Sequence, residues 1–121
     1  MMLTLVLAAM LQSTPSVDPL VDLPAGYVLR APKPQRMSET LARSGSLSPM
    51  VSRGAAVVEC QVKPDGALTA CVAVEESPVG RGVGRALVAV VRTFKLVPSG
   101  ANAPPLTPGT VRIPLHFTSP Q

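Results

Sequence analysis

A short turn between two apolar segments, each carrying one cysteine, constrains the fold of this 121-residue chain most strongly. The turn, K-P-D-G at residues 63–66, combines a Pro that presets φ, an Asp that can bond its own backbone and a Gly that accepts positive φ. If the flanking segments 55–63 and 67–75 pair as antiparallel strands, Cys60 lies opposite Cys71. Opposed residues of such a pair have Cβ atoms close enough for a disulfide. We therefore predict a hairpin closed by a Cys60–Cys71 disulfide.

Alternation along this hairpin gives it one apolar face. The residues predicted to face the core are Val58, Cys60, Val62, Leu68, Cys71 and Ala73. Those of the second strand reach this face only if a bulge residue follows Gly66, as in a three-residue hairpin loop with Gly at the bulge. The hairpin is therefore expected to contain one bulge next to its turn.

A structural disulfide is the favoured role of the two cysteines, over a metal site or a redox pair. A metal site requires more ligands than Cys60, Cys71 and the single histidine, His116. A redox pair is typically spaced C-x-x-C, whereas these cysteines are far more widely separated. Because disulfides persist in oxidising compartments, the pair also indicates export.

Residues 82–95 have the spacing of an amphipathic helix. The apolar positions of its predicted buried stripe are Val83, Leu87, Val90, Val91 and Phe94. Arg85 and Arg92 lie on the opposite side and form a basic helix face. This face can meet an acidic partner, although a solvated helix face is the more common role of such arginines.

Residues 110–118 alternate as a final strand. One face is predicted to carry Val111, Ile113, Leu115 and Phe117, and the other Arg112, Pro114 and His116. Because proline cannot donate a ladder hydrogen bond, we expect an edge strand, or one whose Pro114 points away from its neighbour.

The N-terminal third has weaker patterning. Residues 1–14 are predicted to be a secretory signal peptide, with an apolar N-terminal strand or tail as the alternative, because the apolar run is too short to span a bilayer. No basic residue precedes that run, and a misassigned start would hide an upstream segment. Residues 15–36 are expected to form a Pro-rich linker, and residues 37–43 a short helix with Ser38 as N-cap.

The predicted fold class is therefore α+β. One domain, residues 37–121, is expected to be a two-layer sandwich. Its three-stranded antiparallel sheet comprises the hairpin 55–63/67–75 and strand 110–118, packed against helix 82–95. With no Trp, one Tyr and two Phe in the chain, the core must be mainly aliphatic.

Taken in order, these segments resemble the C-terminal domain of TonB-type energy transducers, over residues 54–117. The resemblance rests on G-x-x-x-x-x-C-x-V-x-x-D-G-x-L-x-x-C from Gly54 to Cys71, and on the ending V-R-I-P-L-H-F at 111–117. Between them come E-S-P at 76–78, the glycines 80, 82 and 84, Phe94 and Pro98. The two cysteines resemble those of one branch of these sequences, which carries a cysteine pair.

This resemblance implies a periplasmic domain, membrane-associated if the true N-terminus is longer, that binds an extended peptide of an outer-membrane receptor at a sheet edge. Two features differ from the family pattern. A Tyr-Pro and an alanine-rich helix usually precede the first strand, where this chain has S-G-S-L-S-P-M at 44–50. A linker of about 25 residues also cannot cross a periplasm at ~3.3 Å per residue. The chain therefore looks like a detached or reduced module.

The partner-binding site predicted from the sequence is the edge strand, comprising Val111, Arg112, Ile113, Pro114, Leu115, His116 and Phe117. Its free backbone groups would dock the peptide. The alternative is that Pro114 and Arg112 protect the edge against such pairing, which is a common use of these residues.

No enzymatic function is predicted. His116 has no nucleophile and acid set around it, and Glu75 and Glu76 point to opposite faces of a strand. The G-x-G-x-G run at 80–84 lacks the final Gly of a dinucleotide-binding loop, so it favours a flexible start to the helix. We expect no metal, cofactor or small-molecule substrate.

The net charge of +4 is compatible with acidic partners, but the shortage of aromatic residues argues against nucleic-acid binding. Three functions are compared: a periplasmic interaction module linked to transport through outer-membrane receptors, an accessory or structural envelope protein, and a small secreted enzyme, which nothing in the sequence supports. The first is preferred.

Overall fold

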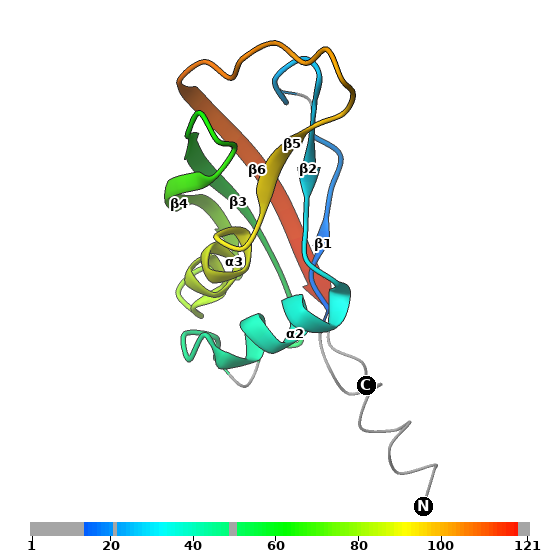
Figure 1. The fold of residues 1–121 in the computed structure, drawn as a ribbon. Helices are drawn as coiled ribbons and strands as arrows, with labels where there is room; N and C mark the ends of the chain where they lie inside the picture. The colour runs from blue at the N-terminus through cyan, green and yellow to red at the C-terminus, as the bar shows by residue number, and fades with distance from the viewer. Residues whose placement is uncertain (1–13, 21, 49–50, 119–121) are drawn as a thin grey trace, which may run out of the picture.

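The structure, a computed structural model, describes residues 14–20, 22–48 and 51–118 (Figure 1). Within these ranges the chain is α+β. The elements in chain order are β1 (Ser16–Val17), β2 (Tyr27–Arg30), α2 (Pro34–Arg43), β3 (Arg53–Val62), β4 (Leu68–Ser77), α3 (Val83–Val91), β5 (Lys95–Pro98) and β6 (Gly109–Thr118).

The β3–β4 hairpin forms around the predicted turn. The Lys63 N–H donates to Ala67 O and the Gly66 N–H to Lys63 O, each at 2.9 Å, and Gly66 has φ +88°. This is the expected three-residue loop with glycine at its bulge position. The turn chemistry therefore determined the local structure as predicted.

A second bulge, which was not predicted, brings the cysteines together. Gln61 pairs with Thr69, but Glu59 pairs with Val72, so β4 carries one extra residue opposite Cys60. Ala70 lies there with φ 51°, a conformation uncommon for residues other than glycine. Without this residue, Cys71 would lie on the opposite face of β4 from Leu68. The single bulge predicted at Gly66 was therefore insufficient.

The main sheet has the strand order β1-β6-β3-β4, and its neighbouring strands are all antiparallel. β6 pairs with β3 along its whole length, from Arg53↔Thr118 to Val62↔Gly109. The prediction of three strands is wrong by one, because Ser16 and Val17 of β1 pair with His116 and Leu115 and add a fourth.

Helix α3 buries the predicted stripe but is shorter than the predicted 82–95. It begins after Gly82, and the chain leaves the helix through Thr93 and Phe94, whose N–H groups bond the carbonyls of Val90 and Val91. From Lys95 onward the chain is β5, which pairs with β2 in a separate two-stranded sheet. Leu96 is almost fully buried there, so tertiary packing selects a strand at this point.

The segment predicted as a linker, 15–36, is instead part of the folded structure. It forms β1, β2 and the first residues of α2, which begins at Pro34 rather than at residue 37. Proline is favoured in the first helical turn because its missing N–H is not needed there. Ser38 is inside the helix and buried, with its hydroxyl 2.8 Å from that of Thr14, so the N-cap prediction is wrong.

The predicted signal peptide lies outside the described residues, apart from Thr14. Neither described helix is long and apolar enough to span a membrane.

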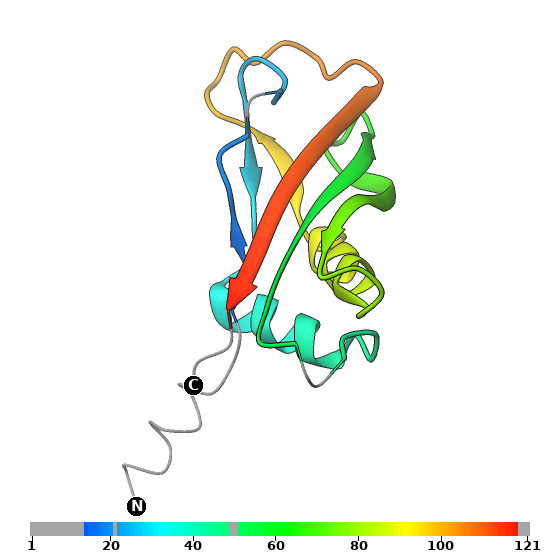
Figure 2. The same ribbon diagram turned by 180° about the vertical axis from the view of Figure 1, so that it is seen from behind.

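The core lies on one face of the main sheet. Helix α3 and the β2–β5 ribbon lie over this face, and α2 lies at its end next to α3, as Figure 1 shows. Within the described residues, no helix or strand covers the other face (Figure 2). The buried sheet residues include Val58, Ile113, Leu115 and Phe117, which contribute to one aliphatic cluster with Leu87 of α3. The coarse prediction of a sheet packed on a helix is therefore confirmed.

Candidate functional site at the β4 edge

The predicted partner-binding strand, 111–117, is an edge of the sheet only in part, because β1 pairs with Leu115 and His116 and no strand of the described chain pairs with the outer side of residues 109–113. β6 lies between β1 and β3, and the Asp18 N–H donates to Pro114 O at 2.9 Å. The carbonyl of Pro114 thus points away from β3, as one of the two predictions for this proline required. The chain's own N-terminal segment therefore covers the second half of the predicted binding strand, at residues 114–116.

The side chains of β6 are also poorly placed to contact a partner. Val111, Ile113, Leu115 and Phe117 are at most 1% exposed. The outward-facing side chains are engaged: Arg112 Nε bonds Glu59 Oε2 at 2.8 Å, and His116 Nδ1 lies 2.9 Å from Asp18 Oδ1. The predicted binding residues therefore serve the core and the open face of the sheet.

The long edge strand of the main sheet is β4. It is the last strand of the sheet order and pairs with β3 on one side alone within the described chain. Val72 and Val74 are 54% and 42% exposed, which is high for apolar residues on a strand. Lys and Pro, which commonly protect edges, are absent from Leu68–Ser77. This strand thus presents unpaired backbone groups next to apolar side chains.

A groove of about 560 Å³ runs between this edge and α3. Its lining residues are Ser44, Ser46, Cys71, Val72, Ala73, Glu76, Arg85, Val88, Ala89 and Arg92. The strand contributes small or apolar residues, and the helix contributes both arginines that were predicted as a basic face. The structure therefore brings the predicted basic helix face and one of the hairpin cysteines, Cys71, into one site.

The helical wall of the groove is one stripe of α3. Arg85, Val88, Ala89 and Arg92 are spaced i, i+3, i+4 and i+7, which places them on the same side of the helix. Arg85 and Arg92 are exposed and form no ion pair with any other residue in the described parts of the chain. Two unpaired guanidinium groups thus flank a short apolar patch.

Two contacts hold this helix against β4. Glu76 Oε2 accepts a hydrogen bond from the Gly84 N–H at 3.3 Å, and the backbone of Gly84 lies close to Ala73. At this position glycine is required for packing, because an added Cβ would come within 2.8 Å of the Ala73 methyl group. Glu76 therefore lines the groove but is already engaged at the first turn of α3.

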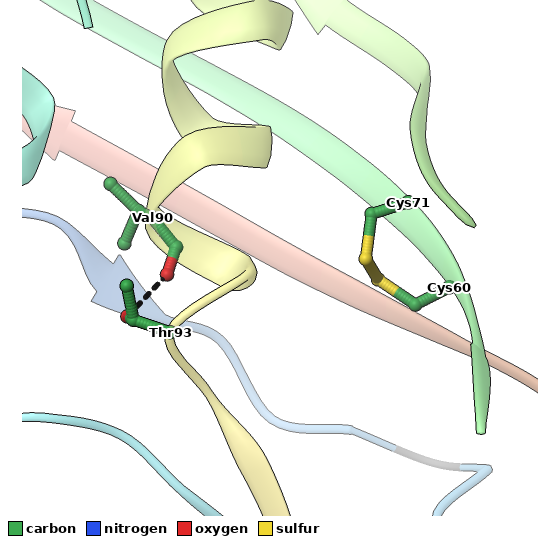
Figure 3. The surroundings of a disulfide bond; sticks show 4 residues. All are labelled: Cys60, Cys71, Val90 and Thr93. Carbon is green, nitrogen blue, oxygen red and sulfur yellow. Dashed lines mark hydrogen bonds between the residues drawn. A yellow bond between two sulfur atoms is a disulfide. The ribbon is translucent and has the colours of Figure 1, made fainter. Parts of the chain in front are cut away.

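The predicted disulfide is present and supports the floor of the groove. Cys60 and Cys71 are bonded, with their Cα atoms 4.1 Å apart, and join β3 to β4 on the side of the sheet that faces α3 (Figure 3). Because Cys71 also lines the groove, the covalent bond fixes the edge strand where a partner would lie.

Residues 14–20, 22–48 and 51–118 contain no candidate metal site. Within these ranges no group of three or more His, Cys, Asp and Glu side chains could hold a metal ion. The pKa of the Asp65 carboxyl is lowered, first by the hydrogen bond from the Ala67 N–H and then by Lys95 and Lys63. This exposed carboxylate serves the hairpin turn.

Comparison of the chain with protein-family models, with curated proteins and with solved structures found no significant match.

Proposed function

We propose that this chain is a protein-interaction module of the Gram-negative cell envelope, similar to TonB C-terminal domains, that binds an extended peptide by adding it as a strand to β4. The carrying observation is the unpaired edge of β4 beside the groove under α3. In strand addition, main-chain hydrogen bonds provide affinity and alternate side chains provide specificity. Here the unpaired backbone of β4 can form the hydrogen bonds, and the groove can receive alternate side chains.

Two further observations support the proposal. The Cys60–Cys71 disulfide suits an oxidising compartment such as the periplasm. The hairpin, α3 and β6 follow one another in the order that the resemblance implies. A link to transport through outer-membrane receptors rests on that resemblance alone.

The alternative is an accessory or structural envelope protein that keeps the fold without receptor coupling. The observation in its favour is β1, which occupies the second half of the β6 edge that was predicted to bind the partner. The two functions differ in whether any edge of the sheet accepts a foreign strand.

Amide chemical shifts distinguish these functions. The oxidised full-length chain, labelled with ¹⁵N, is titrated with synthetic peptides covering the N-terminal segments of outer-membrane receptors encoded in the same genome. Binding should shift amides of residues 69–77 and leave those of 110–117 nearly unchanged. Shifts confined to 110–117 would show that the peptide binds along β6 instead, and no shifts at millimolar peptide would favour the accessory role.

A further inference from the structure

The groove under α3 also has a chemical preference, which rests on the function proposed above. We infer that the strand added to β4 is an acidic segment whose carboxylates face α3 and bind Arg92 and Arg85. Three features of the groove support this inference: the spacing of Arg85 and Arg92 along the helix, the position of the acidic lining residue Glu76, and the lack of aromatic lining residues.

The position of the two arginines relative to an added strand follows from the sheet geometry. Cys71 and Ala73 line the groove from the face of β4 that α3 covers. In an antiparallel neighbour every second side chain would point to this face. Those side chains would enter the space that Arg85, Val88, Ala89 and Arg92 surround.

The spacing of the stripe predicts a sequence pattern for the partner. Arg85 and Arg92 are seven residues apart, which is about 10 Å along a helix. Residues i and i+4 of a strand are about 13 Å apart, within reach of two long arginine side chains. The residue between them, i+2, would face Val88 and Ala89. A segment of the form acid-x-small apolar-x-acid therefore fits the groove.

The charges in the groove favour acidic residues in the partner and indicate which of the two arginines binds a carboxylate more strongly. The charged side chains that line the groove are Arg85, Arg92 and Glu76. Glu76 lies at the first turn of α3, beside Gly84, and offsets the charge of Arg85 there. No acidic side chain lines the groove near Arg92, so this guanidinium should make the stronger, bidentate contact with a carboxylate.

A nucleic acid is a poorer fit to the same arginines. Stacking platforms for bases are aromatic, and the residues that line this groove include none. An acidic peptide uses both the guanidinium groups and the free backbone of β4, whereas a phosphate backbone would use the arginines alone.

A pair of synthetic peptides tests the inference. The probe is an acetylated and amidated nonapeptide, T-T-D-T-A-T-D-T-T, and its matched control replaces both Asp by Lys. Two further peptides keep both Asp residues but carry N-methyl groups on alternate amides, one for each of the two possible registers, so that neither can extend the sheet. Binding to the oxidised full-length chain is measured by calorimetry and by amide shifts of residues 69–77.

We expect the acidic peptide to bind, to weaken with added salt, and to bind at least about fivefold more tightly than the lysine peptide. Arg92→Glu should weaken the acidic peptide more than Arg85→Glu does, and the double variant should prefer the lysine peptide. Arg81→Glu is the matched control, since Arg81 is exposed, lies just before α3 and does not line the groove. It should have little effect.

The outcomes separate this inference from the proposed function. Equal binding of the acidic and lysine peptides, unaffected by charge reversal but abolished by N-methylation, would overturn the acidic preference and leave strand addition intact. Charge-dependent binding that tolerates N-methylation would overturn strand addition. If neither peptide shifts residues 69–77, both are overturned. Circular dichroism of each variant confirms that the fold is retained.

Discussion

Reduction of the Cys60–Cys71 disulfide should destabilise this protein substantially. The two cysteines are separated by 11 positions in the sequence. For a loop of about this size, the chain-entropy relation gives a loss of about 9 cal/mol/K, or about 3 kcal/mol at 25 °C. Domains of this kind are stable by only about 5–15 kcal/mol, so the change is a large part of the total.

Reduction is a cleaner perturbation than substitution. Cys60 and Cys71 are 1% and 6% exposed, so replacing them with alanine would add packing losses to the loss of the bond. The assay compares urea unfolding of the oxidised and reduced chains by far-ultraviolet circular dichroism, because the chain has no Trp. With an m value of about 1 kcal/mol/M, the midpoint should fall by roughly 2–3 M.

The same reduction should loosen the edge strand locally. Ala70 holds a positive φ opposite Cys60, and the disulfide fixes Cys71 beside it. Amide hydrogen exchange of residues 70–72 should therefore accelerate more than that of β6. Midpoints that agree within about 0.5 M, with complete reduction verified by mass, would refute the argument that the disulfide stabilises this hairpin.

Two further predictions concern the turns that position the helix and the hairpin. Gly82→Ala should destabilise by at least about 2 kcal/mol in urea unfolding, because φ is +80° and the added Cβ would collide with the Ser46 carbonyl oxygen. Gly80→Ala is the matched control, with φ +76° and open space, and an equal loss in both would contradict the steric argument. Asp65→Asn should reduce the loss of stability in acid. The pKa of the Asp65 carboxyl is lowered in the folded protein, so this group stabilises the fold above its unfolded pKa. This contribution disappears as the pH falls through the folded pKa. The effect should be seen below about pH 4. If the wild type and the variant lose stability equally between roughly pH 7 and pH 2, the Ala67 hydrogen bond has no such role.

Local patterns predicted the hairpin, the disulfide and the inward faces of α3 and β6, because each depends on residues close in sequence. The residues of the K-P-D-G turn themselves favour the turn conformation, and the alternation of apolar and other residues from Val111 to Phe117 is uninterrupted. By contrast, the bulge at Ala70 involves no Gly or Pro, so nothing in the sequence signalled it.

The N-terminal strands were missed because they are specified by their partners. Ser16 and Val17 form a strand because β6 offers backbone groups, and Tyr27 to Arg30 pair with a strand that follows α3. Neither segment is long enough to show a period. Five prolines in 15–36 made a linker the natural prediction.

The candidate site was predicted in part. The arginines of α3 and the cysteines were identified, but their juxtaposition depends on strand order, which alternation does not reveal. Pro114 was a misleading signal for an edge, because the N-terminal segment bonds its carbonyl and needs no N–H from it.

The short strand β1 has a consequence for self-association. A sheet with two long open sides can accept a copy of itself on each, and such pairing can propagate without limit. Here β1 shortens one of these sides, because Ser16 and Val17 pair with the second half of β6 and leave only residues 109–113 without a strand on that side in the described chain. The longer open side is β4, and a β4-to-β4 contact between two copies would close as a symmetric pair.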